Sequence, residues 1–222
     1  MESKIIALKT RDNFEIIGDY YAVLTKNAPA AVLIHMMPAT KESWKVFAKK
    51  LNETGFHCLA IDLRGHGESQ GGPDGFRGFN DEDHQASVYD VESAVDYFIR
   101  KGIPLEKISI IGASIGANLA LQFQSRHSEI KSSVLLSPGF DYHGIEIEKA
   151  AKKLNSDQAI FFAAGGENDA YSTETANKLY NLAQSSDKQI KIFRDVGHGT
   201  TIFKEEPSFM DELASWLKSI YF

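Results

Sequence analysis

The feature that most constrains the fold is an alternation, along the whole chain, of short apolar runs and segments with helical periodicity. Such runs are typical of strands, and a helix between two strands allows them to lie parallel in one sheet. Their nearly continuous apolar character predicts strands buried on both faces. The predicted strands are residues 30–35, 57–62, 108–112, 133–137, 159–164 and 189–193. The expected fold class is therefore α/β, with a mostly parallel sheet flanked by helices.

The segments between these runs carry apolar residues at i, i+3, i+4 and i+7, the spacing of one helix face. One such segment starts after Thr40, a typical N-cap residue, and stops at Gly55. Residues 82–100 and the segment that begins near Pro207 are predicted as further helices. Ahead of the parallel unit, residues 3–23 predict an antiparallel hairpin.

Length, charge and cysteine content narrow the class of protein. A chain of 222 residues is long enough for one domain, predicted as residues 1–222, with a large core. The single cysteine, Cys58, excludes an internal disulfide or a cysteine-rich zinc site, and its strand position predicts a small buried hydrophobe. No metal site is expected.

The net charge of −6 disfavours nucleic-acid binding. The segment 1–9 is too short in apolar residues for a signal peptide, and no stretch approaches the ~18 residues of a membrane span. A soluble, cytoplasmic protein without a membrane or nucleic-acid partner is predicted.

The most specific chemical signal is the pentapeptide Gly-Ala-Ser-Ile-Gly at residues 112–116, a G-x-S-x-G motif between a predicted strand and a predicted helix. A serine on such a sharp turn adopts a strained backbone conformation, so its neighbours must be small, and its hydroxyl projects beside the N–H groups of the helix start. Ser114 is therefore the predicted nucleophile.

A serine hydroxyl requires a general base, and the base requires an anion that orients it. His198 lies in a glycine-flanked loop just after the last predicted strand, which fits the chain order serine, acid, histidine. For the acid, Asp169 is preferred because it comes late in the loop after strand 159–164, and Glu167 is the runner-up. Asp195 lies too close to His198 in sequence to sit beside it easily.

The oxyanion of an acyl-transfer reaction needs two preorganised N–H donors. The first is predicted to be the backbone N–H of Ile115, directly after the serine. The second is predicted from the loop after strand 30–35, with Met37 preferred and Met36 as the alternative. His35 at the end of that strand is expected to shape the loop by hydrogen bonding.

The charged, glycine-rich loop at residues 62–69 could pass for a phosphate-binding loop, but it lacks the third glycine of a dinucleotide fingerprint, and the chain contains no P-loop. A structural loop is predicted instead. Arg64 is expected to pair with a carboxylate, with Asp62, Glu68 or Asp90 as its partner.

In this order and spacing, the motifs resemble those of the α/β-hydrolase superfamily. They are a histidine-led loop after the first parallel strand, Asp-x-Arg-Gly-His-Gly-x-Ser at 62–69, the serine turn at 112–116, Gly-x-x-Asp at 166–169 and Gly-His-Gly at 197–199. The resemblance implies Ser114 as nucleophile, Asp169 as orienting acid and His198 as base. It extends to small serine carboxylesterases, including those active on aryl or cinnamoyl esters, and to dienelactone hydrolases. The latter comparison implies cysteine at the nucleophile, where this chain has Ser114.

Relatives of this kind often carry a lid ahead of the acid loop. Here residues 138–158 are short and hold one helical stretch, so at most a minimal lid is expected and an interfacial lipase is disfavoured. The expected activity is a serine esterase that acts on short-chain or aryl esters through an acyl-enzyme, without a cofactor and with a small-molecule ester as its partner. The alternatives are a thioesterase or peptidase with the same triad, and a non-catalytic receptor or scaffold with this fold.

Overall fold

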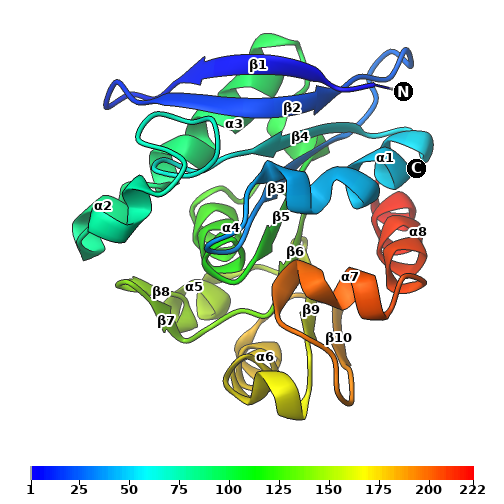
Figure 1. The fold of residues 1–222 in the computed structure, drawn as a ribbon. Helices are drawn as coiled ribbons and strands as arrows, with labels where there is room; N and C mark the ends of the chain where they lie inside the picture. Colours follow the sequence, from blue (N-terminus) through cyan, green and yellow to red (C-terminus); the bar gives the residue numbers. More distant parts are fainter. Residues whose placement is uncertain (1) are drawn as a thin grey trace.

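An eight-stranded sheet runs through the computed structural model, which describes residues 2–222 (Figure 1). Met1, the first residue of the amino-terminal segment considered above, lies outside the described residues. The strand order is β1-β2-β4-β3-β5-β6-β9-β10. The strands are β1 Lys4–Lys9, β2 Glu15–Tyr21, β3 Ala30–Ile34, β4 His57–Ile61, β5 Ile108–Ala113, β6 Ser132–Leu136, β9 Ala159–Ala164 and β10 Lys188–Ile192.

Strand direction follows the sequence prediction. β1 and β2 form the antiparallel hairpin, and β2 also pairs antiparallel with β4. From β4 to β10 every neighbouring pair is parallel. The predicted mostly parallel sheet with an amino-terminal hairpin is therefore confirmed, and β1 and β10 form its two edges.

Helices cover both faces of this sheet because alternate strand residues point in opposite directions. On one face Val32, Ile110 and Phe162 pack with residues of α3, α4, α5 and α6. On the other face Leu33 and Ile111 pack with residues of α1, α7 and α8. The helices are α1 Lys45–Glu53, α2 Asp81–Gln85, α3 Val88–Arg100, α4 Ile115–Arg126, α5 Glu148–Lys153, α6 Ala170–Leu182, α7 Ile202–Glu205 and α8 Phe209–Tyr221. Cys58 is buried in the second of these clusters, as predicted.

Short 3₁₀ turns join several elements. They are η1 Lys41–Trp44, η2 Gly75–Gly78, η3 Leu105–Lys107, η4 Glu167–Asp169 and η5 Gly199–Thr201. Thr40 is the N-cap residue of η1, which continues directly into α1, and Gly55 follows α1 with a φ of 104°. The predicted start and stop of this helical segment are thus confirmed, although the Thr40 side chain makes no capping hydrogen bond.

Two predictions about the elements were wrong. Residues 82–100 do not form one helix, because α2 and α3 are separated at Ala86 and Ser87. The polar α2 has its own capping box at Asn80 and packs through His84, whereas the apolar α3 packs on the sheet. β10 is not buried on both faces either. As an edge strand it is partly exposed, with Ile192 at 37% exposure.

Two chain excursions lie near each other above the carboxyl ends of the strands (Figure 1). The first contains η2 and α2, and the second contains the short hairpin of β7 Asp141–Tyr142 and β8 Ile145–Glu146, followed by α5. They meet where the ring of His84 stacks on that of His143 at 4.0 Å between centroids, and where the Gln85 side-chain amide donates to the carbonyl of His143. The second excursion lies within residues 138–158, where the sequence predicts at most a minimal lid. Across residues 2–222, no helix has the length and apolar character that a membrane crossing requires.

Candidate active site

Ser114 occupies a sharp turn between β5 and α4. Its backbone has φ 55° and ψ −122°, a conformation that a residue with a side chain rarely adopts. The two glycines of the motif make the turn possible. A Cβ on Gly112 would lie 2.0 Å from the carbonyl oxygen of Gly116, and a Cβ on Gly116 would lie 2.4 Å from that of Ile34. A side chain at either position would therefore clash with the backbone, which explains why both neighbours of the serine turn are glycine.

Asp169 and His198 are brought together by the loops after β9 and β10. Oδ1 of Asp169 lies 2.8 Å from Nδ1 of His198, and their side chains are 6% and 37% exposed. Burial raises the pKa of Asp169, but hydrogen bonds with His198 and Ser137 outweigh burial, so that this pKa lies below its ordinary value. The carboxylate only accepts, so Nδ1 of His198 is the donor. In the neutral ring Nε2 then carries the lone pair that can accept a proton.

Glycines allow these two loops to touch. A Cβ on Gly165 would lie 2.3 Å from the carbonyl oxygen of Val196, and a Cβ on Gly166 would lie 2.1 Å from that of Phe193. The backbones are also joined by a hydrogen bond from the Val196 N–H to the Gly165 carbonyl at 3.1 Å. The position of the acid relative to the histidine is therefore set by backbone packing between the loops.

The other carboxylates considered for the acid position lie elsewhere. Glu167 is exposed, and its backbone N–H bonds to the carbonyl of Arg194. Asp195 is exposed and forms a loose ion pair with Arg194 at 3.8 Å. Of the three, Asp169 is the carboxylate that contacts the imidazole of His198.

Ser137, which sequence reasoning did not identify, lies between the acid and the histidine loop. It follows β6, is fully buried and has a φ of 52°. Its Oγ accepts the N–H of Gly199 at 2.7 Å, and its hydroxyl lowers the pKa of Asp169. Buried Ser172 acts on this pKa in the same direction. The one sequence signal for Ser137 was its position directly after a buried strand, at the carboxyl end of the strand, as Ser114 is at the carboxyl end of β5.

The histidine loop also lies against the serine turn. A Cβ on Gly199 would lie 3.4 Å from the Cβ of Ala113, the residue before Ser114. Ser114 itself is 8% exposed. The three predicted residues thus lie in the segments that follow β5, β9 and β10, at the carboxyl ends of the strands, where a parallel sheet of this kind opens to ligands.

Tyr142 of the β7–β8 hairpin adds a hydroxyl to this group. Its oxygen lies 3.5 Å from Oγ of Ser172 and 3.5 Å from the carbonyl oxygen of Ser137. Burial raises the pKa of Tyr142 against the lowering effects of the Ser172 and Ser114 hydroxyls, so its phenol stays protonated at neutral pH. The sequence carried no signal for this residue, because its position depends on the path of a loop.

His35 has the structural role that the sequence predicted. It is fully buried, and its Nε2 accepts the N–H of Leu63 at 2.9 Å. Its Nδ1 must therefore carry the proton and donate to the carbonyl of Met36, also at 2.9 Å. The peptide between Met36 and Met37 is planar and trans, so the N–H of Met37 points away from His35. Ile115 is the first residue of α4, where backbone N–H groups have no partner within the helix.

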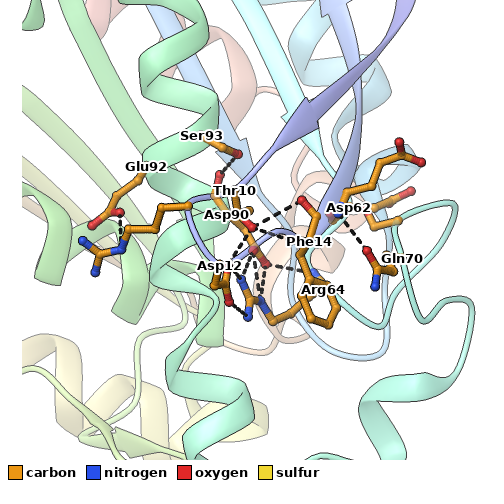
Figure 2. A network of polar contacts seen from close by, with 12 residues as sticks. Thr10, Asp12, Phe14, Asp62, Arg64, Gln70, Asp90, Glu92 and Ser93 are labelled. Atoms are coloured by element: carbon orange, nitrogen blue, oxygen red, sulfur yellow. Dashed lines mark hydrogen bonds and ion pairs between the residues drawn. The ribbon is translucent and has the colours of Figure 1, made fainter.

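The loop at residues 62–69 is a structural loop, as predicted, but only one of the expected partners of Arg64 is correct. Figure 2 shows the guanidinium of Arg64 between the carboxylates of Asp90 and Asp12. Nη2 of Arg64 lies 2.8 Å from Oδ1 of Asp90, and Nη1 lies 2.7 Å from Oδ2 of Asp12. Asp12 comes from the β1–β2 turn, a contact across 52 residues that no local pattern reveals. Asp62 instead accepts from the backbone and side chain of Lys41, at 2.7 and 3.0 Å. Glu68 also pairs with Lys41.

Comparison with known proteins agrees with this architecture. The family model described as alpha/beta hydrolase fold matches residues 29–217. A carboxylesterase of Bacillus subtilis is 22% identical over 86% of this chain and 93% of its own length, and an uncharacterized protein of Rickettsia prowazekii is 28% identical over 85% and 77%. Among solved structures, an esterase of Pyrococcus furiosus superposes with a TM-score of 0.77 at 18% identity, covering 100% of this chain and 94% of that one.

Proposed function

Since the chain belongs to the alpha/beta hydrolase fold family, we propose that it is a serine esterase that cleaves short-chain or aryl carboxylic esters. The observation that carries the proposal is the 2.8 Å hydrogen bond between Asp169 and His198, beside the strained turn that holds Ser114. A buried carboxylate that orients a half-exposed imidazole near a serine is the arrangement that activates a hydroxyl nucleophile. The names of the Bacillus and Pyrococcus relatives support the same activity.

In the proposed first step, Oγ of Ser114 attacks the ester carbonyl carbon while Nε2 of His198 takes the hydroxyl proton. The tetrahedral intermediate collapses, the bond between the carbonyl carbon and the alcohol oxygen breaks, and His198 gives the proton to that oxygen. The alcohol leaves, and the acyl group remains on Ser114. Water then attacks the acyl-enzyme by the same route, which releases the carboxylic acid and restores the serine.

Two backbone donors are proposed for the oxyanion. The N–H of Ile115 is at the start of α4, where the helix dipole adds partial positive charge. The N–H of Met37 is the second donor. Its support is the hydrogen bond from His35 to the Met36 carbonyl, which fixes the orientation of the following peptide plane. His35 would then act on the reaction only by positioning this loop.

The absence of large chain insertions near the site supports a substrate that does not need a broad lipid-facing lid. The excursions that carry α2 and the β7–β8 hairpin are short and pack on each other through His84 and His143. A cytoplasmic location, independence of a cofactor and the use of a small-molecule ester remain predictions from the sequence.

The direct test is Ser114→Ala, assayed on p-nitrophenyl acetate together with labelling by a fluorophosphonate. We expect turnover to fall to background and labelling to disappear, because the nucleophile is gone. Unchanged turnover in the variant would refute Ser114 as the nucleophile. A wild-type chain that neither turns over esters nor accepts the label would favour a non-catalytic binding protein. Parallel assays with a thioester and an anilide would show whether the same triad serves thioesterase or peptidase chemistry.

A further inference from the structure

A cavity of about 610 Å³ lies between the start of α1 and the corner of α7 and α8, which is within the size range of small-molecule sites. Most of its lining is apolar and includes Met36, Phe47, Phe203 and Met210, and the charged Glu42 and Lys204 also line it. Phe47 and Phe203 stack on each other at 5.1 Å between ring centroids and give the cavity a rigid floor. The proposed chemistry of Ser114, Asp169 and His198 does not involve this cavity.

The cavity borders the loop that carries His198. Its wall includes Thr200 and Thr201, which follow His198 after a single glycine. Met36 separates the cavity from the serine turn. A Cβ on Gly199 would lie 2.5 Å from Sδ of Met36. Met36 is only partly buried and its side chain has three rotatable bonds, so a modest rotation would join the cavity to the space beside His198.

The proposed reaction determines where the alcohol group and the acyl group of an ester lie relative to the histidine loop. The alcohol oxygen must come within hydrogen-bond distance of Nε2 of His198 to receive its proton, so the alcohol group extends along the histidine loop. The acyl group is bonded to Ser114 and extends away from that loop. Thr200 and Thr201 belong to the histidine loop, so the cavity that they border lies on the side of the alcohol group.

We propose that this cavity binds the leaving alcohol of the substrate, and that the substrate is an ester of an uncharged apolar alcohol longer than ethanol. The inference rests on the proposed esterase function. Apolar walls select such an alcohol, because the transfer of each methylene from water to an apolar cavity is favourable. Met36 is then a specificity-determining residue.

The test fills the cavity with Ala39→Phe. Ala39 lines the cavity and is partly exposed, so an added ring can enter the cavity from its rim. Ala22→Phe, at an exposed position after β2, is the matched control. Two ester series separate the halves of the substrate: acetates of ethanol to octanol, and ethyl esters of acetic to octanoic acid. We expect the ratio of kcat/KM for octyl acetate to that for ethyl octanoate to fall about tenfold in Ala39→Phe and to stay constant in the control. An unchanged ratio, or a fall confined to the acyl series, overturns the proposal.

A binding measurement keeps this inference separate from the proposed activity. The chain has two tryptophans, so Trp216→Phe leaves Trp44, whose ring lies 6.0 Å from Phe203 on the cavity floor. In a Ser114→Ala background, 8-bromooctan-1-ol should quench this fluorescence saturably, and Ala39→Phe should abolish the saturable part. Quenching without any hydrolysis by the wild type would refute the esterase and keep the cavity site. Hydrolysis without saturable quenching would refute the cavity site and keep the esterase.

Discussion

His198 and His35 both follow parallel strands and lie at the carboxyl ends of those strands. Their surroundings differ, and the difference distinguishes a reactive imidazole from a structural one. His35 is fully buried, and both of its ring nitrogens are used by backbone groups of Leu63 and Met36. His198 has a 37% exposed side chain, and only its Nδ1 is committed, to Asp169. A histidine that is to move protons needs one nitrogen left for the substrate. A histidine that holds a loop needs both nitrogens bonded.

The largest effect that this comparison predicts is on the activity of His198→Ala. We expect kcat on p-nitrophenyl acetate to fall by about 10⁵-fold or more, because the general base is lost while Ser114 remains. The free energy of unfolding in urea should change by less than about 1 kcal/mol, since the side chain is partly exposed. Substantial residual turnover would mean that His198 is not the base.

The opposite balance is expected for His35→Leu. Removal of the ring leaves the buried N–H of Leu63 and carbonyl of Met36 without their partners, which should lower the free energy of unfolding by about 4 kcal/mol. Urea denaturation followed by tryptophan fluorescence measures this loss. Activity should fall far less than in His198→Ala, when both are assayed at a temperature where the variants are folded. A stable but inactive His35→Leu would place His35 in the chemistry instead.

Acid conditions should sharpen the same contrast. Burial, with a smaller contribution from nearby His66, lowers the pKa of His35 to about 4, whereas an unfolded histidine titrates near 6.5. Between these values the unfolded chain binds a proton that the folded chain excludes, so stability is fully present above pH 6.5 and falls as pH decreases. For this one group the loss amounts to about 3 kcal/mol by pH 4. Urea midpoints measured from pH 7 to 4 should slope less steeply in His35→Leu than in wild type, and equal slopes would contradict this titration.

The smallest predicted effect concerns Ser137. Its substitution tests how much the activity that depends on His198 also depends on the hydrogen bonds that position the histidine loop and Asp169. Ser137→Ala removes the acceptor of the Gly199 N–H and one hydroxyl that stabilises the Asp169 carboxylate. We expect kcat to fall about tenfold with little change in KM, since one hydrogen bond of about 1.5 kcal/mol is lost. The acidic limb of the pH profile should also move, which a purely structural defect would not produce. Ser137→Thr, which keeps the hydroxyl, is the matched control.

Local sequence patterns predicted the parts of this molecule that depend on neighbouring residues. The parallel strands, the amino-terminal hairpin and the pairing of Asp169 with His198 were expected, because apolar runs, glycine positions and chain order carry that information. The break between α2 and α3 was missed, since both halves have helical composition and only their different packing partners separate them.

The features that sequence reasoning missed around the site are long-range contacts. Arg64 reaches Asp12 across 52 residues, and Ser137 reaches Gly199 across 62. Tyr142 approaches the serine only because its hairpin folds back over the sheet. Such contacts are determined by how loops pack after the strands are in place, and no periodicity in the sequence encodes them.

The two edges of the sheet have a consequence for the behaviour of the protein at high concentration. β1 and β10 each have one strand neighbour, so each offers free backbone groups to which a strand of another chain could add. Both edges carry lysines, Lys4 and Lys9 on β1 and Lys188 and Lys191 on β10. An incoming strand would have to bring its own backbone beside these charges. The lysines therefore protect an otherwise apolar sheet against aggregation by edge-to-edge pairing.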